Sequence, residues 1–478
     1  MERVEAEAIY AQGEGPVVEV LLALSARVEA QERQLAALTE RLEELEQRLK
    51  RDSRTSSRPP SQDPPWTQPR GRSRGTGRKQ GGQPGHEGHG RSLFPLERVA
   101  EVIEHWPARC PCGHRFTADE YMASGPPARH QVVELPPLAV EVSEHRLQRV
   151  RCPDCGRTTR AELPPGVPAG CFGPKLQAAV AALTVRNRLS RRQLAQLMEE
   201  LFGCPIATGT IDAILARTAE SLQPVYEQLL EQTQSAAAVN VDETGWYLAG
   251  NQRTLWGAFS NRTAVLRIAP DRGGQQLQAL LGSNFAGVVG SDRFTAYNSL
   301  DPNRRQVCWS HLRRDFTFHA ELGLGPQEAF GLDGLSITWR LFKAWQQFQQ
   351  DGDRHALQDA IAPLKRELRR LLEWGAHGKR QRHVHGLARN LLKLWPALWT
   401  FATVPGVEPT NNTAERGLRA AVIYRKLSLG SQSERGERTT ERLLSIDQTC
   451  RLQRRSLYHY LADALTARTR GDPLPTLA

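Results

Sequence analysis

The sequence lacks any run of about 18 apolar residues, the length that a membrane-spanning helix needs. The N-terminal stretch MERVEAEAIYAQGEG is acidic and has no apolar core, so it does not resemble a secretory signal. Cysteine is scarce, with 8 in 478 residues, which excludes a disulfide framework and fits a reducing compartment. We therefore expect a soluble cytoplasmic protein without a membrane partner.

A single hydrophobic core is excluded by length, because 478 residues exceed what one core usually organises. The chain has 63 Lys and Arg against 52 Asp and Glu, a formal net charge of +11. Such an excess indicates a polyanionic partner, although it says nothing about the fold. We expect a multidomain α+β protein.

Residues 1–50 predict a coiled coil. Apolar residues recur there at alternating intervals of three and four, as a supercoiled seam requires. The seam consists of Leu21, Leu24, Val28, Leu35, Leu38, Leu42, Leu45 and Leu49, with Gln31 as its one polar member. The pattern favours a homo-oligomer whose register Gln31 would fix. An amphipathic helix lying on its own globular body is the alternative.

Residues 51–91 are rich in Pro, Gly and Ser and almost free of apolar side chains, so they predict a disordered linker. Nine Lys and Arg, Arg78 and Lys79 among them, stand against three acids. A plain solvated linker and a basic arm that follows DNA phosphates are both compatible with this composition.

Residues 92–165 predict a zinc-ribbon-like module with one structural Zn²⁺. Two close cysteine pairs, each with a proline, have the spacing of knuckles that supply four thiolates. The ligands would be Cys110, Cys112, Cys152 and Cys155. Because the first pair is C-x-C, His114 is an alternative ligand. Alternating apolar residues in HQVVELPPLAVEVSEHRLQRVR predict a hairpin between the pairs. The four remaining cysteines are isolated and expected to be buried.

Residues 171–235 predict helices, with Pro174 in a first turn and a break at GCP. Helix, glycine-containing break and helix resemble a helix-turn-helix that binds DNA. Many helical pairs bind nothing, so both interpretations stay open.

Residues 236–320 predict three strands, a helix, a strand and a further strand running into a helix, the order of a ribonuclease-H-like core. Asp242 and Asp292 each end a short apolar strand. One such aspartate is commonly a turn former, but two in one sheet can share divalent cations at adjacent strand ends. Trp246, Trp256 and Trp309 are expected in the core.

A two-metal site usually needs a third acid. Glu415 is the best candidate, because it follows helix-start signals in TNNTAERG within a last core segment, 406–450. Its rivals are expected in loops or on an exposed helix; they are Glu408, Glu434, Glu437 and Glu441. Residues 321–405 predict an all-helical insertion, and 451–478 a C-terminal tail.

These features together resemble the transposases of the insertion sequence 66 family, which use a DDE triad. The matching segments are SSRPPSQDPP, RKQGGQPGHEGH, the cysteine pairs, VDETGW, GSDRFTAY, CWSHLRRDF and NNTAERGLRAAVIYRKLSLGS. The resemblance implies that Asp242, Asp292 and Glu415 are catalytic and hold two Mg²⁺ or Mn²⁺ ions. It further implies cleavage of transposon ends, then attack of the freed 3′-hydroxyl on target DNA.

Partners follow from the same resemblance: double-stranded DNA as transposon ends and target, and helper proteins encoded by the same element, in a bacterial cytoplasm at the nucleoid. Basic residues expected to contact DNA phosphates are His311, Arg313, Arg314, Arg425, Lys426, Arg78 and Lys79. A solvated basic helix face is the alternative for the first five. Competing functions are a sequence-specific DNA-binding protein or inactive transposase relic without catalysis, and a purely hydrolytic nuclease of the same fold.

Overall fold

The computed structural model describes most of the chain outside the 51–91 segment. The described residues are 3–11, 13–49, 52, 55, 92–136, 138–322, 325–377 and 382–477. The chain divides into two compact units: Met1–Thr67 with Glu144–Met198 and Pro205–Ala478, and Gln68–Ser143 with Glu199–Cys204. Arg78 and Lys79 lie outside the described residues.

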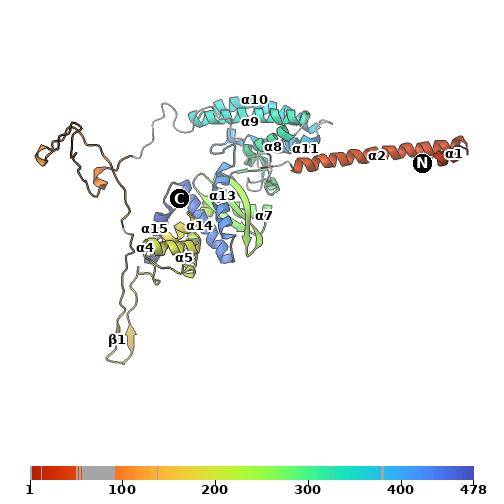
Figure 1. Ribbon diagram of the computed structural model, residues 1–478. Helices are drawn as coiled ribbons and strands as arrows, with labels where there is room; N and C mark the ends of the chain where they lie inside the picture. The colour runs from red at the N-terminus through yellow and green to blue at the C-terminus, as the bar shows by residue number, and fades with distance from the viewer. Residues whose placement is uncertain are drawn as a thin grey trace. The chain divides into compact units, whose positions relative to one another are not determined.

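A five-stranded mixed sheet forms the centre of the first unit (Figure 1). Its strands are β3 (Ala238–Leu248), β4 (Asn251–Phe259), β5 (Ala264–Ala269), β6 (Val288–Ser291) and β7 (Arg305–Val307). The spatial order is β5-β4-β3-β6-β7, with β3, β4 and β5 antiparallel and with β6 and β7 parallel to β3. This mixed sheet is consistent with the ribonuclease-H-like core that the sequence predicts.

The β3–β4 hairpin turns on two residues, Ala249 and Gly250, both with positive φ (47° and 84°). Such a two-residue turn matches the twist of its strands, and it fixes the register of both. Large aromatic residues are buried in and beside the sheet, since Trp246 on β3, Trp256 on β4 and Trp309 after β7 are each 0% exposed. The prediction that these tryptophans belong to the core is confirmed.

Helices cover the sheet. They are α7 (Gly274–Leu281), α8 (Trp309–Leu322), α13 (Asn412–Ser428) and α14 (Glu434–Leu452). Helix α13 packs on β3 and β4, and α14 lies along the edge strand β5 (Figure 1). This contact provides acceptors for the N–H groups on the outer side of β5, which come from side chains one turn apart on α14. The bonds are Ile268 N–H to Glu441 Oε1 (2.5 Å), Leu266 N–H to Ser445 Oγ (2.8 Å) and Ala264 N–H to Thr449 Oγ1 (3.0 Å).

In the described part of the chain between α8 and α13 stand the α-helices α9 (Pro326–Asp351), α10 (Arg354–His377), α11 (Arg382–Lys393) and α12 (Thr400–Thr403). They occupy the stretch expected as a helical insertion. Their apolar faces share one buried cluster with α8, in which Phe316 and Phe330 lie 5.8 Å apart, centroid to centroid. The end of β7 and the start of α8 are therefore held by the insertion's core.

The segment before the sheet contains α3 (Pro174–Val185), α4 (Arg191–Phe202), α5 (Thr208–Ser221) and α6 (Gln223–Gln234). Pro174 stands in the first turn of α3, as predicted. The C-terminal residues do not form a bare tail: α15 (Leu457–Arg470) packs on α3 and buries Leu457 and Leu461. Without α15 the alanine-rich surface of α3 would be exposed to solvent. The sequence pattern within 451–478 does not by itself indicate this contact.

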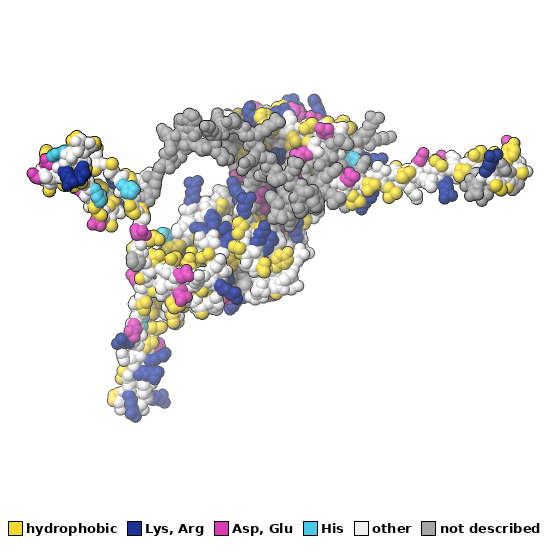
Figure 2. Space-filling model, in the orientation of Figure 1, with side chains coloured by type: hydrophobic (Ala, Val, Ile, Leu, Met, Phe, Trp, Pro, Cys, Tyr) yellow, Lys and Arg dark blue, Asp and Glu magenta, His cyan; other side chains and the backbone are white. Residues whose placement is uncertain are grey.

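At the N-terminus, α1 (Arg3–Tyr10) precedes α2 (Glu14–Leu49), a helix of 36 residues. Members of the predicted seam are exposed along α2, with Leu21 at 60%, Leu35 at 64% and Leu42 at 61%, and Figure 2 shows apolar side chains along this helix. Within the described residues, no helix is both long and apolar enough to cross a membrane.

A short antiparallel pair, β1 (Arg149–Arg151) and β2 (Thr158–Arg160), carries the second cysteine pair in its turn. The hairpin predicted between the two cysteine pairs is wrong, because the described residues from His130 to Gln148 form no strand. Pro136 and the proline after it cannot donate to a ladder, which accounts for the difference. Figure 2 shows Lys and Arg side chains gathered on the β1–β2 hairpin.

Candidate active site

Strand register brings Asp242 and Asp292 level with each other. Asp292 follows the end of β6 as expected, whereas Asp242 lies inside β3 and not at a strand end, because β3 continues to Leu248. Asn240 on β3 lies opposite Gly290 on β6 in a parallel ladder, and each aspartate follows two residues later. Residues at matching positions of neighbouring parallel strands lie side by side, so the register brings both carboxylates near each other. Asp292 is further oriented by the Phe294 N–H, which donates to its Oδ1 at 2.8 Å.

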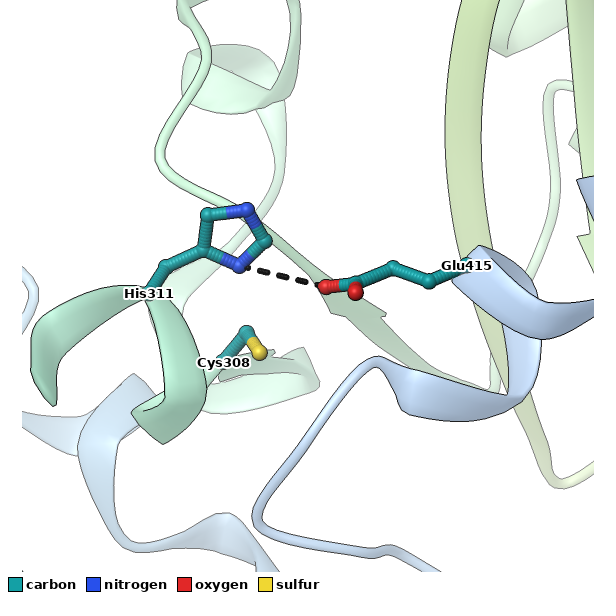
Figure 3. A group of neighbouring side chains, drawn as sticks. All are labelled: Cys308, His311 and Glu415. Atoms are coloured by element: carbon teal, nitrogen blue, oxygen red, sulfur yellow. Dashed lines mark ion pairs between the residues drawn. The ribbon is translucent and has the colours of Figure 1, made fainter. Parts of the chain in front are cut away.

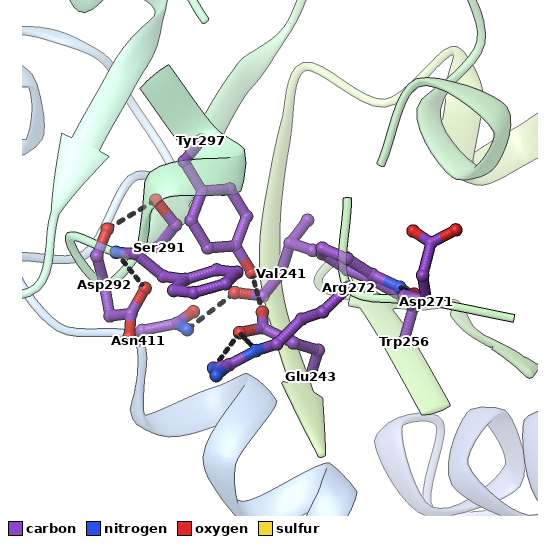
Figure 4. A network of polar contacts seen from close by, with 10 residues as sticks. Val241, Glu243, Trp256, Asp271, Arg272, Ser291, Asp292, Tyr297 and Asn411 are labelled. Carbon is purple, nitrogen blue, oxygen red and sulfur yellow. Dashed lines mark hydrogen bonds and ion pairs between the residues drawn. The ribbon is translucent and has the colours of Figure 1, made fainter. Parts of the chain in front are cut away.

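Glu415 approaches these aspartates from the first turn of α13. Asp242 pairs with Gly257 across β4, and a Cβ built at Gly257 would be 3.0 Å from Leu418 Cδ2. The helix therefore lies on the face of β3 to which Asp242 points. Asn411, 1% exposed just before α13, donates through Nδ2 to the Val241 carbonyl at 2.8 Å (Figure 4). That bond holds the first turn, with Glu415, against β3 next to Asp242.

Burial and neighbouring carboxylates raise the pKa of both Asp242 and Glu415. Burial raises the pKa of Asp242 well above its usual range, and the charges of Glu243, Asp292 and Glu415 raise it further. Burial and Asp292 raise the pKa of Glu415, while Arg314 opposes them. Their oxygens do not all lie within 4.8 Å of one another in the described structure. The site thus concentrates carboxylates in a largely buried position between β3, β6 and α13.

The donor set fits hard divalent cations. Carboxylate oxygens are the ligands that Mg²⁺ prefers, and a cation would offset the repulsion that raises these pKa values. In addition, Glu415 Oε1 is buried without a hydrogen-bond partner. A buried oxygen of this kind is costly unless something binds it.

A fourth acid of the site, Glu243, is not predicted from the sequence. It follows Asp242 on β3 and therefore points to the opposite face, where its side chain is fully buried. Tyr297 donates its hydroxyl proton to Glu243, and Arg272 Nε donates to Glu243 Oε1 at 2.8 Å (Figure 4). The signal was available, since Glu243 and Tyr297 belong to the same VDETGW and GSDRFTAY segments. Their network braces the strand behind Asp242.

Arg305 on β7 was also missed. It is 0% exposed and donates to three acceptors: the Asp292 carbonyl (2.6 Å), the Tyr297 carbonyl (3.0 Å) and Ser291 Oγ (3.2 Å). Burial lowers its pKa to about 10, so the guanidinium stays charged at neutral pH. Arg305 fixes the backbone that carries Asp292.

Glu415 has two further neighbours, Cys308 and His311 (Figure 3). His311 Nδ1 lies 3.6 Å from Glu415 Oε1. Burial lowers the pKa of His311 to about 3, with help from Arg314 and Arg293, so the imidazole is neutral at pH 7 and the contact is not an ion pair. Cys308, expected to be merely buried, is part of this cluster.

The basic residues expected on DNA have different positions. Arg313 is exposed on α8, whereas His311 and Arg314 are half-buried beside Glu415. Arg425 donates to the Gly245 carbonyl and to Thr244 Oγ1 (3.4 Å), so it also holds α13 on β3. Lys426 is exposed on the next position of α13.

Each cysteine pair occupies a tight turn. Cys110 N–H donates to the His114 carbonyl (2.9 Å), and Cys152 N–H donates to the Arg157 carbonyl (2.8 Å). Backbone amides lower the pKa of the Cys112 and Cys152 thiols, as suits metal ligands. His114 Nε2 contacts Glu120 Oε2 at 3.2 Å. The pairs belong to different units, so their joint zinc site stays a prediction.

Relatives from Sinorhizobium fredii have no described function. "Uncharacterized protein y4jD" is 26% identical over 289 residues, which cover 55% of this chain and 56% of that protein. "Uncharacterized protein y4hP" is 23% identical over 420 residues, 80% of this chain and 74% of that protein. The chain thus spans little more than half the length of the first of these relatives.

Two family models match. Residues 14–92 match a family of unknown function (DUF6444). Residues 169–439, more than half of the chain, match the model described as "Transposase IS66 family", and they include the sheet, the insertion and all three acids. The resemblance noted from the motifs is confirmed: the chain belongs to the IS66 transposase family.

Proposed function

We propose that this chain is a DNA transposase that cleaves the ends of its element and joins them to target DNA, using Asp242, Asp292 and Glu415. The observation that supports the proposal best is the register of β3 and β6, which brings two aspartates level with each other beside the first turn of α13. A site rich in negative charge can act on a polyanion only with cations bound. Two Mg²⁺ or Mn²⁺ ions held by the three acids would supply activation of the attacking oxygen and stabilisation of the leaving oxygen.

The chain's own residues orient this site. Arg305 holds the Asp292 backbone, Asn411 holds the start of α13, and Tyr297 with Arg272 fixes Glu243 behind Asp242. In the first reaction a water oxygen bonds to phosphorus as the bond to the 3′-oxygen breaks, which frees a 3′-hydroxyl. In the second, that hydroxyl replaces the 3′-oxygen of a target phosphodiester. Neither reaction needs a covalent protein intermediate.

Other parts of the chain would assemble the DNA complex. Helix α2, with its exposed leucine seam, is proposed to pair with a second copy, and the cysteine turns to hold a structural Zn²⁺. Helices α3–α6 and the basic residues Arg313, Lys426, Arg78 and Lys79 are proposed to contact DNA. Helper proteins of the same element and a place at the bacterial nucleoid belong to the same proposal.

The test uses the full-length protein, a labelled duplex carrying the element's own end, a target plasmid and Mg²⁺ or Mn²⁺. Asp242→Asn, Asp292→Asn and Glu415→Gln each remove a charge with little change in volume, and Glu434→Gln on α14 is the matched control. We expect joined end–target products with the parent and the control and none with the three variants. Cleavage without joining would favour the nuclease, and end binding without cleavage the DNA-binding protein.

A further inference from the structure

The cluster around Glu415 contains softer ligands than a magnesium site needs. Among the described residues, Cys308, His311 and Glu415 are the one group of three His, Cys, Asp or Glu side chains whose ligand atoms all lie within 4.8 Å of one another (Figure 3). Thiolate and imidazole ligands favour Zn²⁺, whereas Mg²⁺ is bound by oxygen. The cluster therefore differs in ligand chemistry from the neighbouring carboxylate site, which offers only oxygen ligands.

Local structure presents these three groups to one point. The Cys308 carbonyl accepts the His311 and Leu312 N–H groups (both 3.2 Å), so Cys308 caps α8 and His311 follows one turn later on the same side. Glu415 comes from the first turn of α13, which Asn411 ties to Cys308 through an N–H to Sγ contact of 3.2 Å. Two helix starts thus face each other across the cluster.

Two of the three ligand atoms lack other partners. His311 Nδ1 and Glu415 Oε1 are buried atoms without a hydrogen bond, 3.6 Å apart. Two ligands of one tetrahedral zinc ion, at about 2.0–2.2 Å each, lie about 3.3–3.5 Å from each other. The observed separation already approaches this value, so an ion could bind with a small inward movement.

We propose that Cys308, His311 and Glu415 form a binding site for Zn²⁺ that is separate from the catalytic metals and shares Glu415 with them. On binding, the Cys308 thiol proton passes to solvent, bonds form from Sγ, Nδ1 and Oε1 to the ion, and water molecules leave its hydration shell. Three protein ligands leave a fourth position for one retained water.

This site has a consequence that depends on the proposed function. Zinc bound here would occupy Glu415, which the proposed catalytic Mg²⁺ ions also need. Zinc should therefore inhibit DNA cleavage, and excess Mg²⁺ should relieve the inhibition. The metal binding itself does not depend on transposase activity. The two claims can therefore fail independently.

The experiment measures zinc binding to the full-length protein, reduced and stripped of metal, in competition with a chromophoric chelator. Cys308→Ser and His311→Asn each remove one ligand. Cys450→Ser is the matched control, because Cys450 is equally buried on α14 and belongs to no ligand group among the described residues. Cys110, Cys112, Cys152 and Cys155 are unchanged in every protein, so any zinc that they bind adds the same amount to each measured stoichiometry.

We expect the parent and Cys450→Ser to bind one more Zn²⁺ per chain than Cys308→Ser and His311→Asn. Cobalt should give the near-ultraviolet cobalt–thiolate band of the additional site in the first two proteins only. Equal zinc stoichiometry in all four proteins, with native circular dichroism, would overturn the proposal. If one variant misfolds, the other decides. The ratio of cleavage rates with and without micromolar zinc then tests the inhibition separately.

Discussion

Gly417 of α13 lies directly against the ring of Phe259 at the end of β4. A Cβ built at Gly417 would be 2.2 Å from Phe259 Cε1 and 2.5 Å from its Cζ, far inside van der Waals contact. A Cβ built at Gly257 on β4 would also clash, because it would lie 2.6 Å from the same ring. Two glycines therefore set how closely the helix that carries Glu415 approaches the strand that pairs with Asp242.

Gly417→Ala should push α13 away from the sheet. Because both the ring and the helix are buried, relief requires movement of the backbone, and we expect a loss of about 1–3 kcal/mol in the free energy of unfolding. Cleavage should fall at least tenfold, because Glu415 moves with its helix. Urea denaturation and the cleavage assay measure the two effects.

Gly386→Ala on α11 is the control, since a Cβ there meets nothing within 4 Å. Alanine favours a helix over glycine, so this change should stabilise the protein by about 0.5–1 kcal/mol. If Gly417→Ala behaved like Gly386→Ala, the close approach of α13 would not matter for the site.

Arg305 offers a test of how Asp292 is held. Arg305→Lys keeps the charge but loses the planar fork that reaches three acceptors, so buried oxygens lose their donors. We expect a loss of about 2–3 kcal/mol in stability and a clear fall in cleavage. Arg304→Lys, one residue earlier and exposed, should change neither quantity. Parent-like melting of Arg305→Lys would contradict this role.

Asp292 could be predicted from sequence because it follows the end of the short apolar strand β6. Asp242 was expected at a strand end as well, but β3 continues to Leu248, and strand register rather than a strand end brings it level with Asp292. The approach of Glu415 could not be predicted, since it depends on packing between Gly417, Phe259 and Gly257, which no local pattern encodes. Glu415 was selected by its helix-start position and by family resemblance.

Other residues were misjudged because sequence gives no spacing across the fold. Cys308 looks isolated in the chain, yet Glu415 reaches it from α13. Glu441 was expected in a loop or on an exposed helix, but it is half-buried and accepts an N–H from the edge strand. Such pairings join segments far apart in the sequence, so periodicity alone cannot reveal them.

The exposed seam of α2 predicts self-association. Leu35→Glu with Leu42→Glu places charges on the seam and should convert oligomers to monomers in sedimentation experiments, because buried like charges repel within the pair. Ala36→Glu with Ala37→Glu adds the same charge beside the seam and should leave the oligomer intact. An unchanged sedimentation profile for the leucine variant would reject the coiled coil.

Glu441 makes the stability of the α14–β5 contact depend on pH. Burial raises the pKa of Glu441 from 4.5 to about 7, although the Ile268 N–H and Arg267 oppose the shift. Below pH 4.5 the group is protonated in both the folded and the unfolded chain, so it has no effect on relative stability. As pH rises from 4.5 to 7, the unfolded chain loses the proton first, and the free energy of unfolding falls.

The loss should approach about 3 kcal/mol above pH 7, since each unit of pKa shift corresponds to about 1.4 kcal/mol. Glu441→Gln keeps an oxygen for the Ile268 N–H and removes the charge, so it should stabilise the protein at pH 8 and have little effect at pH 4.5. Glu434→Gln, whose side chain is 74% exposed on the same helix, should leave the pH profile unchanged. Parallel stability curves for Glu441→Gln and the parent between pH 4.5 and 8 would show that the edge strand does not hold this carboxyl group in a buried state.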